Sequence, residues 1–338
     1  MMVFDSQNPL VSILIPTYNR EALIGEAIES ALNQTYQNIE LIIVDNASTD
    51  NTILVIESYQ KKDQRIKLFQ NEKNLGPVLN WERCLENASG EYSKILWSDD
   101  LIAPEFLESC LSLFNIKKDL AFVFTKAQIG NNPLDKNIAE CYDYFGKTGI
   151  FNASEFVDGI IANKSLPVSP GCAIFRTEIL KKSFIKTNEL FENKYLQNGA
   201  GPDLLMFLMA SRIGDKIGYV NEALSFFRSH PSSISILEES NLFIFYCKAV
   251  IWFIYTQINK DLANAHYLRI KKSLRDNKKI TESFELKPEF VRNNLMVIFY
   301  GYDLKIAFFK RKIFRLGVKA LCCLMSKDKR RKIRKKLL

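Results

Sequence analysis

Acidic residues follow two of the short apolar runs in the first hundred residues of the chain. Asp45 comes directly after residues 40–44, and Asp99 and Asp100 come soon after the apolar part of residues 92–97. Carboxylates are the ligands that hard divalent cations prefer, and a protein-bound Mg²⁺ commonly holds substrate phosphates as well. These acids therefore predict a cation and phosphate site, provided that both runs end at the same place in the fold.

A third apolar run, residues 11–15, ends in the polar sequence Pro-Thr-Tyr-Asn-Arg at residues 16–20. Ligands of open α/β sheets bind just beyond the carboxyl ends of the strands. If the three runs are parallel strands of one sheet, their polar clusters meet in one crevice.

The stretches between the apolar runs support this arrangement. Segments with apolar residues at helical spacing alternate with the runs, which is the pattern of a doubly wound α/β domain. We expect strands at 11–16, 39–44, 65–69, 92–97, 120–124 and 216–227, and helices at 21–33, 52–62, 78–87, 104–114 and 204–212. Residues 126–170 are rich in turn residues and predict a less regular region that can contribute specificity.

Five motifs resemble, in order and spacing, those of family 2 glycosyltransferases with the GT-A fold. They are Pro-Thr-Tyr-Asn-Arg at 16–20, Val-Asp-Asn-Ala-Ser-Thr-Asp at 44–50, Asn-Leu-Gly at 74–76, Gly-Glu-Tyr at 90–92 and Ser-Asp-Asp at 98–100. The resemblance covers roughly residues 9 to 235. It implies a GT-A-type α/β fold, a doubly wound, mixed and mostly parallel sheet with flanking helices.

The same resemblance implies an activity. Members of the family move a sugar from a nucleotide diphosphate sugar, most commonly a UDP sugar, to an acceptor, usually with inversion and with Mg²⁺ or Mn²⁺. By this likeness Asp99 matches the metal-binding acid, while Asp100 either assists the metal or caps the following helix. The family usually has Asp-x-Asp here, and Trp97 stands at the first Asp position. This departure leaves the strength of the metal dependence open.

Donor-binding roles are also implied by the resemblance. Asp45 matches the acid that binds the uracil or ribose of the donor, and Tyr18 is placed to stack on the base. Pro16 and Thr17 would shape the strand end beside it, and Ser98 would join them on the donor side. The alternative is that the sequence around Asp45 simply forms a turn, since Asp, Asn and Ser favour turns.

Arg228 and His230 lie in a stretch that resembles the family's Tyr-Arg-x-His-x-x-Ser element. A guanidinium group there can bind the donor phosphates, and an imidazole can bind phosphate or metal. The alternative is a surface loop.

Asp203 is the expected general base. An inverting transfer needs a carboxylate that takes the proton of the acceptor hydroxyl as its oxygen attacks. The family's base commonly lies in an acidic pair at the start of a late helix, and Pro-Asp stands here in its place. The alternative is a helix cap, a role that Asp fills well. Glu189 and Glu192 are poorer candidates for the base.

Charge is distributed unevenly along the 338 residues. The net charge is +8, but residues 305–338 hold 14 Lys or Arg and one acid, or +13, which leaves −5 for the rest. This basic segment also contains regularly spaced apolar residues, so we expect it to bind an anionic membrane surface. A solvated terminus and nucleic-acid binding are the alternatives. The apolar stretch 242–258 is slightly short for a membrane span, and a packed helix is expected there.

The expected organisation is a GT-A domain at 1–240, a helical extension at 241–304 and a basic amphipathic tail at 305–338. Seven cysteines without CxxC spacing argue against a disulfide framework or zinc site, and the start of the chain has no secretory signal pattern. We therefore expect a cytoplasmic protein, peripheral on the inner face of the cell membrane.

These observations lead to one main hypothesis and two alternatives. The main hypothesis is a metal-assisted, inverting glycosyltransferase that uses a nucleotide sugar and a glycan or lipid-linked acceptor in surface polysaccharide or glycolipid synthesis. The first alternative is a non-catalytic nucleotide-binding scaffold of a membrane-associated assembly. A dinucleotide oxidoreductase also fits the alternation of strands and helices, but no GxGxxG follows the first strand.

Overall fold

The computed structural model describes residues 8–133, 138–184, 199–230, 233 and 242–275 of the chain. The chain divides into two compact units, Met1–Ser229 and His230–Leu338. The basic segment 305–338 and the alternative base candidates Glu189 and Glu192 lie outside the described residues. The division into three domains therefore stays a prediction.

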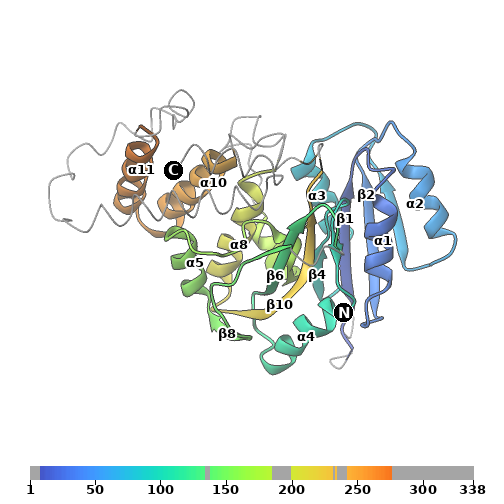
Figure 1. The fold of residues 1–338 in the computed structure, drawn as a ribbon, viewed down its shortest axis with the longest axis horizontal. Helices are drawn as coiled ribbons and strands as arrows, with labels where there is room; N and C mark the ends of the chain where they lie inside the picture. The colour runs from blue at the N-terminus through green and yellow to red at the C-terminus, as the bar shows by residue number, and fades with distance from the viewer. Residues whose placement is uncertain (1–7, 134–137, 185–198, 231–232, 234–241, 276–338) are drawn as a thin grey trace. The chain divides into compact units, whose positions relative to one another are not determined.

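A ten-stranded sheet forms the centre of the first unit, with the order β3-β2-β1-β4-β9-β6-β10-β5; β7 pairs with β6, and β8 with β10 (Figure 1). The strands are β1 (Val11–Thr17), β2 (Ile39–Asp45), β3 (Ile66–Gln70), β4 (Tyr92–Ile95), β5 (Leu101–Ile102), β6 (Phe122–Gly130), β7 (Ala139–Cys141), β8 (Gly149–Asn152), β9 (Ala173–Arg176) and β10 (Lys216–Arg228).

Strand direction confirms the expected mixed and mostly parallel sheet. β3, β2, β1 and β4 are parallel neighbours, and β6 and β10 are parallel to each other. β9 runs antiparallel to both β4 and β6, so β4 and β6 run in the same direction. The carboxyl ends of β3, β2, β1, β4, β6 and β10 therefore lie along one edge of the sheet.

Helices cover both faces of this sheet (Figure 1). One core contains side chains of α1, α2 and α4, and the other contains side chains of α3, α5, α6 and α8. Ile13 and Ile15 of β1 belong to the first core and Leu14 to the second, because successive side chains of a strand point to opposite faces. The helices are α1 (Ile24–Leu32), α2 (Thr52–Gln60), α3 (Pro77–Glu86), α4 (Phe106–Ile116), α5 (Ala153–Ile161), α6 (Thr177–Ser183) and α8 (Pro202–Ile213), with the 3₁₀ turn η1 (Pro170–Cys172) before β9.

The helices α3 and α8 begin in the same way. Each starts with a proline, Pro77 or Pro202, that follows a glycine with positive φ, 82° at Gly76 and 101° at Gly201. Proline suits the first helical position because its missing N–H would have no partner there. Glycine accepts the left-handed backbone without a Cβ clash. The two Gly-Pro pairs thus fix where each helix begins.

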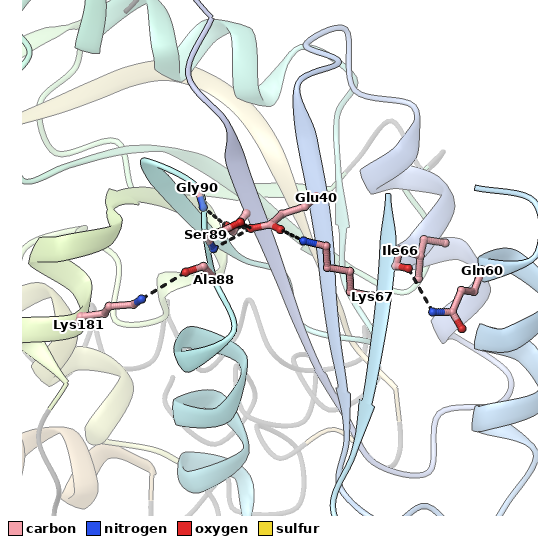
Figure 2. Close-up of polar contacts among 9 residues, drawn as sticks. Glu40, Gln60, Ile66, Lys67, Ala88, Ser89, Gly90 and Lys181 are labelled. Carbon is pink, nitrogen blue, oxygen red and sulfur yellow. Dashed lines mark hydrogen bonds and ion pairs between the residues drawn. The ribbon is translucent and has the colours of Figure 1, made fainter. Parts of the chain in front are cut away.

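Glu40 at the start of β2 is a buried carboxylate at the sheet edge opposite the strand ends described above. Its oxygens accept hydrogen bonds from the Ser12 hydroxyl (2.6 Å), the Ser89 N–H and hydroxyl (2.8 Å each) and the Lys67 ammonium (2.6 Å) (Figure 2). Burial alone would raise the pKa of Glu40, but these hydrogen bonds outweigh burial and lower the pKa. Glu40 thereby joins β1, β2, β3 and the turn before β4.

The second unit contributes α10 (Leu242–Phe253), the π-helical turn η3 (Ile254–Ile258) and α11 (Lys260–Arg275). Asn259 caps the start of α11, since its side-chain oxygen accepts the backbone N–H groups of Asp261 (2.8 Å) and Leu262 (3.0 Å). Within the described ranges, no helix is both long and apolar enough to cross a membrane.

Candidate functional site

The predicted donor-side residues follow strands that end at the same edge of the sheet. β1 ends at Thr17, β2 ends at Asp45 in register with it, and β10 ends at Arg228. Asp99 and Asp100 follow β4, which is also parallel to β1. The common strand direction, which a sequence pattern cannot measure, is what gathers these residues along one edge.

The loops after β1 and β2 are fastened to each other. The Asn19 N–H donates to the Ser48 hydroxyl at 2.9 Å, while the Asn19 side-chain oxygen accepts the Thr49 N–H at 2.8 Å. Asn19 and Ala47 have positive φ values of 50° and 62°, which bend the two loops into this contact. These bonds hold the segment containing Tyr18, which is 40% exposed, against the end of β2.

Asp45 is fully buried, and both of its carboxylate oxygens accept hydrogen bonds from Ser48, one from the backbone N–H and one from the hydroxyl. Asp45 therefore fixes the start of the loop that follows β2. Pro16 and Thr17 are buried beside it in β1, and the Thr17 hydroxyl is a buried polar group without a hydrogen-bond partner. The donor-binding roles of these residues stay predictions.

A cluster of asparagine side chains, which the sequence analysis missed, lies next to the end of β2. Asn46 donates to Asn74 at 2.9 Å and accepts from Asn71 at 3.0 Å, and Asn71 also donates to Asn80 at 2.9 Å. Asn80 in turn donates to the Val44 carbonyl at 3.0 Å. The amide network fixes the loop before α3 against β2, which explains the Asn-Leu-Gly motif as a structural element.

Asp99 is the more accessible acid of the pair that follows β4. Its side chain is 18% exposed, and a carboxylate oxygen lies 3.5 Å from a guanidinium nitrogen of Arg20. Arg20 also donates to the backbone carbonyls of Tyr18 and Asn19. Arg20 stands in the first quoted motif, but its position in the sequence alone predicted no role for it. The structure brings together the loop after β1 and the acid expected to bind metal.

Asp100 is buried and holds the end of β10. One carboxylate oxygen accepts the Arg228 backbone N–H at 2.9 Å. Burial and the neighbouring Asp99 carboxylate raise the pKa of Asp100 well above its usual range. The Arg228 guanidinium points instead to Glu26 of α1, with 2.7 Å between the charged atoms. Asp100 therefore acts as a structural anchor in this state, while the donor-side role of Arg228 stays a prediction.

Lys94 of β4 is a second residue that the sequence analysis missed. It is fully buried, its ammonium group donates to the Gly171 carbonyl, and it lies 4.4 Å from the centre of the Phe106 ring. Burial lowers the pKa of Lys94 to about 8. A single charged residue in a short, fully buried strand was the available signal. Lys94 ties β4 to the turn η1 beneath the acidic pair.

Asp203 lies in the first turn of α8 and is 6% exposed. Its Oδ1 accepts the backbone N–H groups of Gly201 and Leu204, both at 2.8 Å. Because α8 begins at Pro202 and Gly201 is its N-cap, Asp203 lies inside the helix and is not the N-cap expected as the alternative. The catalytic role of Asp203 stays a prediction. Ser98 is buried in the loop after β4, and His230 belongs to the second unit rather than to the unit that holds the other candidates.

The site's acids fit a divalent cation that is also held by a substrate. No group of three or more His, Cys, Asp or Glu side chains gathers to form a ready metal cage in the described part of the chain. Asp99 offers one carboxylate, and Mg²⁺ sites in enzymes commonly use one or two carboxylates, substrate phosphates and water. A metal here would accordingly depend on Asp99 and on the phosphates of a bound donor.

Comparison with known proteins agrees with this geometry. Residues 12–184 match the family model described as Glycosyl transferase family 2. The chain is 29% identical over 278 residues to the GalNAc(5)-diNAcBac-PP-undecaprenol beta-1,3-glucosyltransferase of Campylobacter jejuni, covering 82% of this chain and 80% of that protein. It is 40% identical over 134 residues to the putative teichuronic acid biosynthesis glycosyltransferase TuaG of Bacillus subtilis, covering 38% and 52% of the two chains.

Three relatives match this chain over shorter stretches. The chain spans 42%, 52% and 32% of their lengths, which is about half or less of each relative. Among solved structures, Staphylococcus aureus TarS 1-349 in complex with UDP-GlcNAc superposes with a TM-score of 0.57 at 22% identity, covering 84% of this chain and 76% of TarS 1-349. At that level of identity the likeness establishes the fold alone.

Proposed function

Because this chain belongs to glycosyl transferase family 2, we propose that it transfers a sugar from a nucleotide diphosphate sugar to a glycan or lipid-linked acceptor with inversion. The observation that carries the proposal is the gathering of Tyr18, Asp45 and Asp99 beyond the ends of parallel strands, where α/β sheets bind ligands.

On the donor side, Asp45 and residues 16–18 at the end of β1 receive the nucleoside. The Tyr18 ring is exposed enough to stack on a base, and the unpartnered Thr17 hydroxyl can accept or donate one hydrogen bond. Ser98 and Arg228 lie at the neighbouring strand ends and complete the phosphate side. The donor-side role predicted for His230 rests on its sequence motif alone. UDP is the proposed carrier because it is the family's commonest one.

Asp99 would hold a Mg²⁺ or Mn²⁺ ion together with the donor diphosphate. Asp100 would assist by anchoring the same loop through its hydrogen bond to the Arg228 N–H. When bound, such an ion stabilises the negative charge that develops on the leaving pyrophosphate oxygens. When no such ion is bound, the guanidinium group of Arg20 neutralises the negative charge of Asp99. With Trp97 in place of the first acid, the protein supplies one accessible carboxylate.

Asp203 is proposed as the general base. As the acceptor hydroxyl oxygen forms its bond to the anomeric carbon, its proton moves to the Asp203 carboxylate, and the bond to the nucleoside diphosphate breaks. The two backbone N–H groups that bind Oδ1 keep the carboxylate in one orientation at the start of α8. A fixed base supports catalysis because correct orientation removes much of the entropic cost.

We place the reaction in surface polysaccharide or glycolipid synthesis. TuaG and the Campylobacter enzyme are named for teichuronic acid and undecaprenol-linked glycan synthesis, respectively. The 14 basic residues of segment 305–338 would hold the enzyme at the inner face of the membrane, beside lipid-linked acceptors.

The test is a hydrolysis and transfer screen. Purified full-length protein is incubated with UDP, GDP and dTDP sugars and with Mn²⁺, Mg²⁺ or chelator, and nucleotide release is recorded with and without undecaprenol-linked glycans. We expect release from one donor that chelator abolishes. Nucleotide binding by calorimetry without turnover on any donor and acceptor pair would contradict the proposal and favour the scaffold alternative.

A further inference from the structure

The side chain at position 97 is fixed at two points. The indole N–H of Trp97 donates to the Ser169 hydroxyl at 2.8 Å, and its ring centre lies 4.9 Å from that of Trp81 on α3, with the rings tilted by 47°. Tilted aromatic pairs at such distances attract each other beyond the area that they bury. Trp97 therefore faces a neighbouring helix and loop as a packed side chain.

Both rings also rest directly on glycine backbone. A Cβ atom on Gly171 would lie 2.9 Å from Cδ1 and Nε1 of Trp97, and one on Gly199 would lie 2.4 Å from Cη2 of Trp81. Neither position has room for a side chain. Gly171, Trp97, Trp81 and Gly199 thus form a continuous line of contacts, which we term the tryptophan bridge.

The tryptophan bridge runs from the loop that holds Asp99 to the start of α8, which holds Asp203. Trp97 precedes Asp99 by two residues in the loop after β4. At the other end, the Gly199 carbonyl accepts the Asp203 N–H at 3.3 Å, and the Gly201 N–H donates to the Asp203 carboxylate. The bridge therefore connects the loop of the donor-side acid to the backbone that orients the candidate base.

We propose that Trp97 and Trp81 are positioning residues that fix the start of α8, and hence Asp203, relative to the Asp99 loop. The inference rests on the proposed function, which gives these two acids their roles. Close-packed side chains transmit displacement because their surroundings relax only partly. In this chain the side chain at position 97 sets the distance between the Asp99 loop and Asp203. Replacing Trp97 by an acid therefore lowers the rate of transfer.

The experiment compares Trp97→Asp, which recreates Asp-x-Asp, with Trp97→Phe, which keeps an aromatic ring. Trp252→Phe is the matched control, since Trp252 is the third tryptophan of the chain and lies in α10 of the second unit. Three quantities are measured on full-length protein: kcat for transfer, the Kd of UDP by calorimetry, and backbone amide hydrogen exchange over residues 201–207.

In Trp97→Asp we expect kcat to fall by about 10²-fold, as small misplacements of catalytic groups do. The Kd of UDP should stay within about threefold of the wild-type value. Exchange over 201–207 should be at least about tenfold faster, since local opening becomes easier. Trp97→Phe should retain most activity and protection, and Trp252→Phe should match the wild type.

Unchanged exchange over 201–207 in Trp97→Asp, or a kcat equal to or above that of the wild type, overturns the proposal. If Trp97→Asp does not fold, Trp97→Leu keeps an apolar side chain but removes the ring contact with Trp81, and unchanged exchange and kcat there overturn the proposal equally. If the wild type transfers no sugar, the proposed function fails, while the exchange measurement still decides whether the bridge holds the start of α8.

Discussion

The guanidinium group of Arg20 lies 3.5 Å from a carboxylate oxygen of Asp99 and links the loop after β1 to the loop after β4. Arg20 also donates to the carbonyl of Tyr18, the residue proposed to stack on the donor base. The ion pair thus occupies the carboxylate proposed to bind metal while no donor is present. A cation must compete with Arg20 for Asp99.

Replacing Arg20 by Gln should therefore strengthen metal binding to the nucleotide-free protein. Partly exposed ion pairs are worth about 0–1 kcal/mol, so the gain in Mn²⁺ affinity should be at most about fivefold. Titration of free Mn²⁺ by electron paramagnetic resonance measures it. Arg228→Gln is the control, because that guanidinium pairs with Glu26. Equal affinities of Arg20→Gln and wild type would show that the pair does not compete with metal.

Asp203→Asn should abolish transfer while leaving the fold and donor binding intact. The Asn side-chain oxygen can still accept the N–H groups of Gly201 and Leu204, but an amide cannot take a proton. A loss of about 10²–10⁴-fold in kcat is expected for a general base. Asp215→Asn, at an exposed acid after α8, is the control. Turnover at the wild-type rate in Asp203→Asn would remove Asp203 from the mechanism.

Glu40→Ala should destabilise the first unit strongly. Removing the carboxylate leaves the Ser12 and Ser89 donors without their buried acceptor, and each buried donor left unsatisfied costs about 1–3 kcal/mol. Urea unfolding measures the loss. Lys67→Met is the comparison: it removes the ion pair but leaves Glu40 bound to its serine donors, so we expect a smaller loss than in Glu40→Ala.

Low pH should remove the stabilisation that the hydrogen bonds of Glu40 provide. Because the pKa of Glu40 is lowered in the folded state, the unfolded chain binds the proton more readily, and the stabilisation is complete above the unfolded pKa near 4.5. It should be lost as pH falls through the folded pKa. Glu40→Gln should lack this part of the pH dependence. Parallel wild-type and Glu40→Gln stability curves between pH 5 and 3 would contradict the lowered pKa.

Lys94→Met should be at least as stable as the wild type at neutral pH. With a folded pKa of about 8, against 10.5 for an ordinary lysine, the buried ammonium group disfavours folding below pH 8 by about 3 kcal/mol. Apolar replacements of buried charges are often neutral or stabilising. Because the unfolded chain holds more protons between these values, wild-type stability should approach that of Lys94→Met as pH rises from 8 to 10.5.

Chemical denaturation of both proteins across that pH range gives the difference directly, since the titrating Tyr and Cys groups are common to both. Lys118→Met, at an exposed lysine, should show no such pH-dependent difference from the wild type. A constant gap between wild type and Lys94→Met would mean that Lys94 keeps an ordinary pKa in the folded protein.

Local sequence signals predicted the parallel part of the sheet well. The runs at 11–16 and 39–44 are β-branched and apolar apart from Ser12 and Glu40, which suits strands buried on both faces, and they became β1 and β2. The strand predicted at 120–124 instead begins at Phe122 and continues to Gly130. Its second half was hidden because the residues there are polar and turn-forming, and because its partners β7 and β10 are distant in sequence.

By itself the sequence determined which residues stand at strand ends, because polar residues that close an apolar run mark that position whatever the fold around them. Tertiary structure alone decided their partners. Arg20 pairs with Asp99 across 79 positions of the chain, Asp100 binds the backbone of Arg228, and Trp97 meets Ser169 and Trp81. Such contacts depend on strand order and on exact distances across the sheet, and no local spacing of residues encodes either.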